Sequence, residues 1–511
     1  MPSRRAPLHF FAAFALAIAG CGGRTGLDGF ALPNDDEGGS LSTSGGASAR
    51  GGNAPAGGRA TGGVAGRTGG GNGDRSGNGG DGGNGGVAGG VNAGGALDGG
   101  PGGEPNGGAA GAEGGAGGAP PIARAVSLAL GAFHSCVGFD DGALRCWGTR
   151  SYIGSGNKLT IGDDETPGSI GPVVVGGTVK QISAGWYHSC ALLQSGNVRC
   201  FGNGAYGMLG YGNTEDIGDD ETPASAGDVN LGDKVLQVSV GSYHTCAVLE
   251  NAKLRCWGRN DHFQLGSSSE DIGDDEAPAA AAFVDVGGPV KQVAAGYAHS
   301  CALLENGRVR CWGTSNAGAL GYGNLATVGN DESPAAAGDV EVGGKVTQIV
   351  AGMLHTCALL DNGRVRCWGS GSQGELGYGN LNNIGDDETP AAAGDVNVGG
   401  KVTQLEAGDF ATCALLDTGA VRCWGAGTNG ELGHGNLADL GDDETPASAG
   451  DIDIGAKATR IDVGTLHVCA ILVTGGVRCW GRASTGALGY GNIFDIGDDE
   501  APASAGDVML Q

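Results

Sequence analysis

The stretch KVTQIVAGMLHTCALLDNGRVRCWGSGSQGELGYGNLNNIGDDETPAAAGDVNVGG, residues 345–400, is the clearest copy of a unit that recurs along the chain. Each copy contains a first cysteine, and consecutive first cysteines are 54 to 56 residues apart. These cysteines are Cys136, Cys190, Cys246, Cys301, Cys357, Cys413 and Cys469. Seven copies at a nearly constant period predict a repeat architecture rather than several unrelated domains.

Each copy is expected to form four short strands. In the quoted copy, residues 346–350 are the first strand, and residues 356–360 and 364–368 form a hairpin across the turn at 361–363. After a long loop, residues 395–398 are expected to be the fourth strand. Seven four-stranded units of about 55 residues predict an all-β fold, a closed seven-bladed β-propeller. A linear β-solenoid is the alternative, although its repeats are usually much shorter.

The register of the hairpin places the two cysteines of a copy opposite each other. In the copy that contains Cys301 and Cys311, a three-residue turn at 305–307 sets Leu303 opposite Val309 and the two cysteines opposite each other. Shifting the register by one residue would place an arginine opposite Leu303. The pattern therefore places the two sulfur atoms within reach of a disulfide.

Fourteen cysteines form seven such pairs, which predicts seven disulfides and an oxidising compartment. The pairs are Cys136–Cys146, Cys190–Cys200, Cys246–Cys256, Cys301–Cys311, Cys357–Cys367, Cys413–Cys423 and Cys469–Cys479. Buried reduced thiols are one alternative. Zinc is a weaker one, because no copy contains closely spaced cysteines.

The recurring pattern G-x-x-H-[ST]-C-A-L-L, then G-x-V-R-C-W-G, then G-x-L-G-Y-G-N resembles the repeats of the regulator of chromosome condensation family. The resemblance covers about residues 125–511, and residues 259–269 of the third copy depart from it most. It implies a seven-bladed propeller. The nucleotide-exchange activity of the founding member does not follow from the fold alone.

The amino terminus predicts export. Residues 1–20 carry Arg4 and Arg5 before a short apolar segment, which is typical of a signal peptide. The residues before Cys21 resemble a bacterial lipobox, which implies cleavage before Cys21 and lipid attachment to it; a plain secretory signal with a chance cysteine is the alternative. Gly22 then favours the outer membrane. We expect a lipid-anchored protein of the cell envelope, at the outer membrane or cell surface.

Residues 21–121 are rich in Gly, Ala and Asn, and the chain contains 109 glycines in all. Such a segment buries too little apolar surface to offset the entropy of ordering. We expect a disordered, lipid-anchored linker over 21–121 and a propeller over 122–511. A glycine-rich interaction segment is the alternative for the linker.

The net charge of −27 disfavours binding to nucleic acids and to anionic membrane surfaces. Cations, basic proteins and neutral ligands remain as partners. The membrane contact that we expect is the lipid anchor, and the propeller is expected to be monomeric.

In every copy except the sixth, which has Ala411, a histidine stands two residues before the first cysteine. In every copy except the second, which has Phe201, a tryptophan follows the second cysteine. A catalytic histidine is normally unique, so we interpret both sets as packing and hydrogen-bonding residues. The histidines are His134, His188, His244, His299, His355 and His467, and the tryptophans are Trp147, Trp257, Trp312, Trp368, Trp424 and Trp480.

Acidic loops are the clearest candidate for a functional site. They comprise Asp163, Asp164, Glu165, Asp219, Asp220, Glu221, Asp274, Asp275, Glu276, Asp386, Asp387, Glu388, Asp442, Asp443, Glu444, Asp498, Asp499 and Glu500, and the fourth copy reads Asn330-Asp331-Glu332. Oxygen ligands suit Ca²⁺, and such carboxylates also suit a basic partner. A local role in turns and in solubility is the third possibility. Apart from Ca²⁺, no cofactor is expected.

The sequence favours a surface-displayed binding module for a protein or a polysaccharide over an enzyme. Loops that differ between copies would carry specificity, and the candidate contact residues are Trp186, Tyr187, Tyr243, His262, Phe263 and Phe410. A lyase or hydrolase acting on an extracellular polymer is the alternative, without a recognisable catalytic set to support it. Guanine nucleotide exchange is a further alternative, from family analogy only.

Overall fold

The structure is a computed structural model that describes residues 123–267 and 270–511. The expected signal peptide, the lipidation site at Cys21 and the whole of the expected linker over 21–121 lie outside the described residues. Within the described part, no helix is both long enough and apolar enough to cross a membrane.

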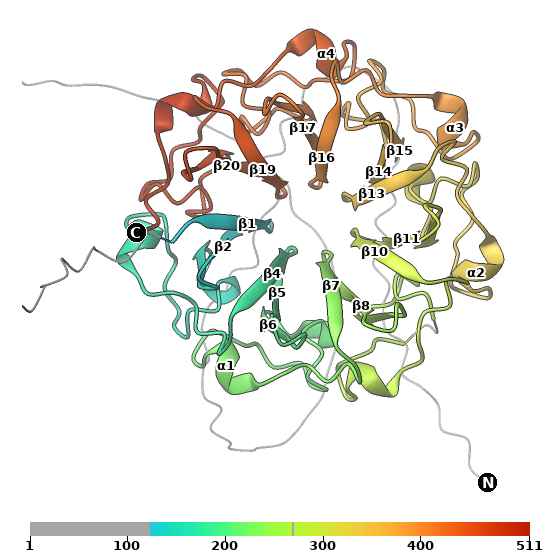
Figure 1. Ribbon diagram of the computed structural model, residues 1–511, viewed down its shortest axis with the longest axis horizontal. Helices are drawn as coiled ribbons and strands as arrows, with labels where there is room; N and C mark the ends of the chain where they lie inside the picture. Colours follow the sequence, from blue (N-terminus) through green and yellow to red (C-terminus); the bar gives the residue numbers. More distant parts are fainter. Residues whose placement is uncertain (1–122, 268–269) are drawn as a thin grey trace, which may run out of the picture. The chain divides into compact units, whose positions relative to one another are not determined.

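Seven antiparallel sheets are arranged around a central axis, so the seven-bladed propeller is confirmed (Figure 1). We call the small cavity on this axis, which is lined by residues at the ends of the first strands, the pore. In each blade the first strand lines the pore, and the second and third strands follow outward. The strands of blades 1 to 4 are β1 (Ala125–Leu130), β2 (His134–Phe139), β3 (Leu144–Gly148), β4 (Val179–Ala184), β5 (His188–Leu193), β6 (Val198–Gly202), β7 (Val235–Val240), β8 (His244–Leu249), β9 (Leu254–Gly258), β10 (Val290–Ala295), β11 (His299–Leu304) and β12 (Val309–Gly313). The strands of blades 5 to 7 are β13 (Val346–Ala351), β14 (His355–Leu360), β15 (Val365–Gly369), β16 (Val402–Ala407), β17 (Ala411–Leu416), β18 (Val421–Gly425), β19 (Ala458–Val463), β20 (His467–Leu472) and β21 (Val477–Gly481).

One turn of helix begins at a proline in every blade, where the fixed φ of proline suits the first helical position. These turns are Pro167–Ser169, α1 (Pro223–Ala226), Pro278–Ala280, α2 (Pro334–Ala337), α3 (Pro390–Ala393), α4 (Pro446–Ala449) and Pro502–Ala505. Further short 3-10 turns occur in the loops after the third strands, at Arg150–Tyr152, Ala205–Gly207 and Asn316–Gly318.

The expected fourth strand is not a regular strand. Each sheet contains three strands, and in blade 5 the segment 395–398 is attached by an isolated bridge between Val396 and Val365. The backbone N–H of Val398 turns back to the carbonyl of Val396 at 3.0 Å, so it does not extend the ladder. An ion pair between Arg366 and Asp395, 3.0 Å long, holds the segment at the edge of the blade.

The predicted hairpin register and all seven predicted disulfides are confirmed. Cys301 lies opposite Cys311 and Leu303 lies opposite Val309. In every blade the two cysteines are bonded, with Cα atoms 4.0 to 4.1 Å apart. The cysteines are buried in the apolar layer between blades. Each disulfide therefore joins the second and third strands of its own blade.

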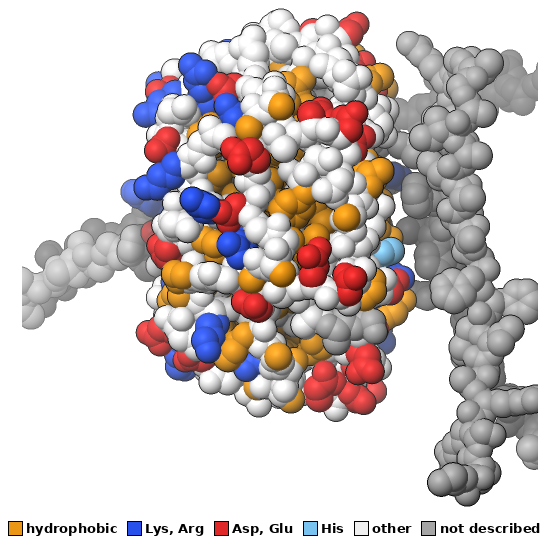
Figure 2. Space-filling view, turned by 90° about the vertical axis from the view of Figure 1, so that its right-hand side faces the viewer, with side chains coloured by type: hydrophobic (Ala, Val, Ile, Leu, Met, Phe, Trp, Pro, Cys, Tyr) orange, Lys and Arg blue, Asp and Glu red, His pale blue; other side chains and the backbone are white. Residues whose placement is uncertain are grey.

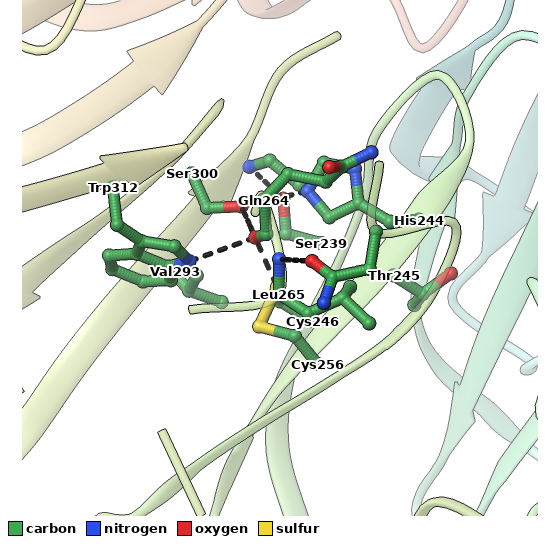
Figure 3. The surroundings of a disulfide bond; sticks show 12 residues. Ser239, His244, Thr245, Cys246, Cys256, Gln264, Leu265, Val293, Ser300 and Trp312 are labelled. Carbon is green, nitrogen blue, oxygen red and sulfur yellow. Dashed lines mark hydrogen bonds between the residues drawn. A yellow bond between two sulfur atoms is a disulfide. The ribbon is translucent and has the colours of Figure 1, made fainter. Parts of the chain in front are cut away.

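A histidine, a hydroxyl and a tryptophan lock neighbouring blades together (Figure 3). His244 Nε2 lies 2.7 Å from Ser300 Oγ in the next blade, and both Ser300 Oγ and Trp312 Nε1 donate to the carbonyl of Gln264, at 2.9 and 2.8 Å. Because the Ser300 hydrogen is used on Gln264, His244 donates through Nε2. Burial lowers the pKa of His244 to about 3, so the ring stays neutral. The structural interpretation of the repeated histidines is thus confirmed.

The one missing histidine is matched by a missing hydroxyl. Blade 6 has Ala411 in place of the histidine, and blade 7 has Val468 where the other blades have Ser or Thr. Both side chains are buried. Replacing both partners at once leaves no unpaired polar group from this bond, which is the less costly way to lose a buried hydrogen bond.

The ring closes between blades 7 and 1 through the same lock. His467 Nε2 lies 2.8 Å from Ser135 Oγ, and Trp147 Nε1 donates to the carbonyl of Ala487 at 2.8 Å. The last residue, Gln511, donates through Nε2 to the carbonyl of Ala123 at 2.6 Å. The two ends of the described propeller therefore meet. The sequence alone does not show how the ring closes; in the structure, blade 7 packs directly beside blade 1 along a junction that we call the seam.

Small residues let the first strands converge on the pore. A Cβ atom added to Gly185 would lie 1.9 Å from the carbonyl oxygen of Gly241, and one added to Gly408 would lie 2.0 Å from that of Gly464. Any side chain at these positions would push neighbouring blades apart. These glycines stand at the end of the first strands, and the loops that follow them emerge on one face of the ring.

We call that face the loop face. It carries the residues after each first strand and the long loops after each third strand. These two kinds of segment are in contact: in blade 5, Ser370 N donates to the carbonyl of Leu354 at 2.9 Å. The opposite face, with the hairpin turns, is the turn face. In the side view of Figure 2, Lys and Arg lie mainly in the left half, whereas Asp and Glu clusters recur down the right half.

Candidate functional site

An aromatic cluster occupies one side of the loop face, around the pore. We call it the aromatic crescent; its members are Phe133, Tyr152, Trp186, Tyr187, Tyr206, Tyr243 and Tyr297. All of them come from blades 1 to 4. At the equivalent loop positions, blades 5 to 7 carry chiefly small, aliphatic or polar residues. The seven blades are nearly identical in sequence pattern, and the crescent is therefore a region in which blades 1 to 4 differ from blades 5 to 7.

The rings pack mostly edge to face or tilted. Trp186 lies 5.6 Å from Tyr243 and 5.4 Å from Tyr297, and Tyr187 lies 5.7 Å from Tyr243, between ring centroids. Such contacts stabilise aromatic pairs beyond their buried area. Tyr206 is 41% exposed, and the remaining rings are half-buried. The result is a surface on which the ring faces are apolar and the tyrosine hydroxyls are polar.

Charged groups flank the crescent. The guanidinium of Arg259 lies 5.0 Å from the centroid of Tyr206 and 5.2 Å from that of Tyr243, within the range of a cation–π contact. Asp261 pairs with Arg259 at 2.5 Å. The ring of His262 lies 6.2 Å from that of Tyr297. Burial, together with the hydrogen-bonded Tyr187, raises the pKa of Tyr243, so its hydroxyl stays protonated.

Trp186 also spans the mouth of the pore. Its Nε1 donates to Asp409 Oδ2 of blade 6 at 2.6 Å, across the ring from blade 2. Burial raises the pKa of Asp409 to about 6, against the effect of the hydrogen bonds from Thr465 and Trp186. The cavity at this mouth measures about 60 Å³, whereas pockets that enclose drug-sized ligands have ~300–1,000 Å³. A ligand of the crescent would thus lie on the surface.

The structure brings together four of the six contact residues that the sequence suggested. Trp186, Tyr187, Tyr243 and His262 meet at the crescent. Phe263 is half-buried in the loop of His262 with a φ of 59°, and Phe410 lies in blade 6; among the described residues, neither has a ring contact with the crescent. Sequence reasoning missed Phe133, Tyr152, Tyr206, Tyr297 and Arg259. Aligning the seven copies would have found Phe133 and Tyr297, which occupy the same loop as Trp186 and Tyr187.

The acidic loops form a separate feature at the outer part of the ring. In five of the triads, such as Asp386, Asp387 and Glu388, one oxygen of each side chain lies within 4.8 Å of the others. In the blade 1 triad, burial and a hydrogen bond with Asp164 raise the pKa of Glu165 to about 7. A proton shared between neighbouring carboxyl groups relieves part of their repulsion.

Calcium binding by these triads stays a prediction. We expect millimolar Ca²⁺ to raise the melting temperature of the protein relative to a chelator-treated sample, because a ligand that binds only the folded state stabilises it. A thermal scan monitored by circular dichroism measures the shift. Mg²⁺ at the same concentration is the control, and identical melting temperatures in Ca²⁺ and in chelator would contradict the prediction.

Comparisons with known proteins agree with the architecture. The family described as RCC1-like domain matches residues 200–508, and the regulator of chromosome condensation (RCC1) repeat matches residues 179–207. The ultraviolet-B receptor UVR8 of Arabidopsis thaliana is 28% identical over 383 residues, which cover 74% of this chain and 81% of that protein. The probable E3 ubiquitin-protein ligase HERC6 of Homo sapiens is 33% identical over 254 residues, which cover 49% of this chain but only 23% of that protein.

Two solved structures show the same fold. Yeast RCC1 (Prp20), in its complex with Kap60, superposes with a TM-score of 0.56 and 18% identity, covering 74% of this chain and 84% of that one. Human WBSCR16 superposes with a TM-score of 0.52 and 20% identity, covering 68% of this chain and 86% of that one. At these identities the likeness concerns the fold.

Proposed function

The chain belongs to the RCC1-like domain family, and from this premise we propose that it is a non-catalytic protein-binding propeller whose contact surface is the aromatic crescent. The observation that carries the proposal is the break in symmetry. All seven blades share the hairpin and the disulfide, and most junctions share the inter-blade lock, yet among the described residues the ring–ring contacts join only side chains of blades 1 to 4. Tyrosine and tryptophan offer large contact areas with few side-chain torsions to fix, which favours them in interfaces.

Two further observations support a role in binding. The repeated histidines are engaged between blades, and burial keeps them neutral, so they serve the architecture. Yeast RCC1 (Prp20) is bound to Kap60 in its solved complex, and Prp20p of Saccharomyces cerevisiae binds Gsp1p and histones, so propellers of this fold do take protein partners.

We also propose that the propeller is displayed in the cell envelope. The support is the lipobox-like sequence before Cys21 together with seven disulfides, which persist in oxidising compartments.

The test compares two triple variants of the full chain, immobilised and exposed to envelope extract. Trp186→Ala, Tyr187→Ala and Tyr243→Ala remove the centre of the crescent, and Met353→Ala, Leu354→Ala and Phe410→Ala remove bulk from the same loops of blades 5 and 6. We expect the crescent variant to lose at least about tenfold of the captured partner, as hot-spot residues do, and the control to retain it.

Treatment of the extract identifies the class of ligand. Protease digestion should abolish capture, whereas removal of glycans should not. Equal capture by both triple variants would refute the crescent as the contact surface. Capture that survives protease but not glycan removal would replace the protein partner with a polysaccharide.

A further inference from the structure

Four exposed aliphatic side chains recur at one repeat position in consecutive blades. They are Leu325, Leu381, Leu437 and Ile493, which are 61, 53, 53 and 57% exposed. Each follows an asparagine that fixes the local turn, as in blade 5, where Asn380 Oδ1 accepts from Asn382 N at 3.0 Å. One exposed leucine is ordinary in a soluble protein, but packing gives no reason for four at the same place.

Backbone bonds place each aliphatic residue beside the acidic triad of the next blade. Asn324 N donates to the carbonyl of Gly385 at 3.1 Å, which sets Leu325 next to the triad 386–388. In blades 5 to 7 the donor lies one repeat position earlier, and the bonds are Gly379 N to Gly441 O, Gly435 N to Gly497 O and Gly491 N to Gly162 O, at 3.0, 3.0 and 3.1 Å. These bonds set Leu381, Leu437 and Ile493 beside the triads 442–444, 498–500 and 163–165.

Blade 1 shows which chemical group such a triad accepts. There the repeat position is Lys158, and its Nζ lies 3.2 Å from Asp219 Oδ2 of the next blade, after the equivalent backbone bond from Gly156 N to Gly218 O. In blades 4 to 7 the position is aliphatic. Among the described residues, no Lys or Arg forms an ion pair with the four triads beside them.

We propose that these four junctions are subsites for lysine or arginine side chains of a basic polypeptide. The methylene stem of the incoming side chain packs on the leucine or isoleucine, and its cationic head binds the carboxylates of the adjoining triad. The strip defined by Leu325, Leu381, Leu437 and Ile493 covers blades 4 to 7, and the crescent covers blades 1 to 4. Several such subsites in a row select a partner that carries several cations.

The net charge of −27 favours the same partner. A lipid surface is the competing occupant of exposed aliphatic side chains, but anionic headgroups would meet the carboxylates beside every one of them. The proposal extends the proposed function by naming a partner chemistry for the loop face, and it rests on residues outside the crescent.

The first experiment occupies the four subsites with lysine side chains of the protein itself. A full-length variant with Leu325→Lys, Leu381→Lys, Leu437→Lys and Ile493→Lys repeats the arrangement of Lys158 in four more blades. Fluorescence anisotropy measures its affinity for a fluorescein-labelled deca-lysine peptide. We expect affinity to fall at least about tenfold, since the triads are then paired internally.

A control variant adds the same four charges to the turn face. Leu236→Lys, Thr347→Lys, Thr403→Lys and Thr459→Lys use the position at which Lys180 and Lys291 stand in other blades. This variant should keep its affinity within about twofold, because the added charges lie far from the triads and are screened by salt. Equal weakening in both variants would mean that net charge alone attracts the peptide, which overturns the proposal.

A third variant tests the apolar half. Leu381→Ser with Leu437→Ser leaves the charge unchanged and should weaken binding about threefold to fivefold through lost contact with the lysine stems. Unchanged affinity, or leucine-dependent binding of the protein to neutral phosphatidylcholine vesicles instead of the peptide, would refute the subsites. The crescent variant should bind deca-lysine as the unaltered chain does, so the two proposals fail separately.

Discussion

A chain refolded with its propeller cysteines kept reduced should fail to form a cooperative fold at 37 °C. Each disulfide joins two cysteines that are ten residues apart in sequence. Because the bond restricts the unfolded chain, it raises the free energy of unfolding by about 2–3 kcal/mol. Seven such bonds together amount to ~14–21 kcal/mol as an upper bound, whereas a whole domain is typically stable by ~5–15 kcal/mol. Differential scanning calorimetry of oxidised and reduced, alkylated samples measures the difference.

The native protein provides the control. Its propeller cysteines are at most 4% exposed, so a mild reductant added to folded protein should leave the melting transition unchanged. Mass spectrometry without reduction should find all fourteen propeller cysteines bonded. Fourteen free thiols in the isolated protein would contradict both the bracing of the blades and the oxidising compartment.

Trp368→Ala should lower the free energy of unfolding by about 3–5 kcal/mol, the cost of removing a large buried ring and leaving a cavity. Trp368 is fully buried between blades 4 and 5, and its Nε1 donates to the carbonyl of Ala319 at 3.0 Å. Thr356 Oγ1 donates to the same carbonyl at 3.0 Å, so the acceptor keeps one partner. Urea unfolding under oxidising conditions measures the loss.

Blade 2 supplies the matched control, because Phe201 stands at this position in the native chain. Trp368→Phe keeps an aromatic ring in place and loses one hydrogen bond and part of the contact area, so it should cost about 1–2 kcal/mol. If both substitutions at position 368 were equally costly, the stabilisation would come from the hydrogen bond instead of the filled volume.

Sequence reasoning succeeded where the physical constraint is local. The hairpin register follows from alternation of apolar and polar residues around a short turn, and the pairing of Cys301 with Cys311 follows from the register. It predicted one strand too many at the outer edge of each blade. Residues 395–398 alternate like a strand, but Val398 bonds back to Val396, and such a local turn leaves no periodic signature that distinguishes it from a ladder.

The candidate site was half predictable for a related reason. Trp186 and Tyr187 stood out because they differ from the equivalent residues of other copies. The contact of Trp186 with Asp409, 223 residues away, depends on ring closure and has no local signal. Likewise, the absence of both the imidazole at Ala411 and the hydroxyl at Val468 is understandable only once blades 6 and 7 are known to be neighbours.

The seam between blades 7 and 1 bears on the order in which the blades follow one another along the chain. Its imidazole, hydroxyl and indole are those of most other junctions, and Gln511 already touches Ala123. A short peptide could therefore join these ends, and new termini could be opened at a hairpin-free loop between any two blades. The architecture is thus compatible with circular permutation, because it fixes which blades are adjacent and leaves open which of them is translated first.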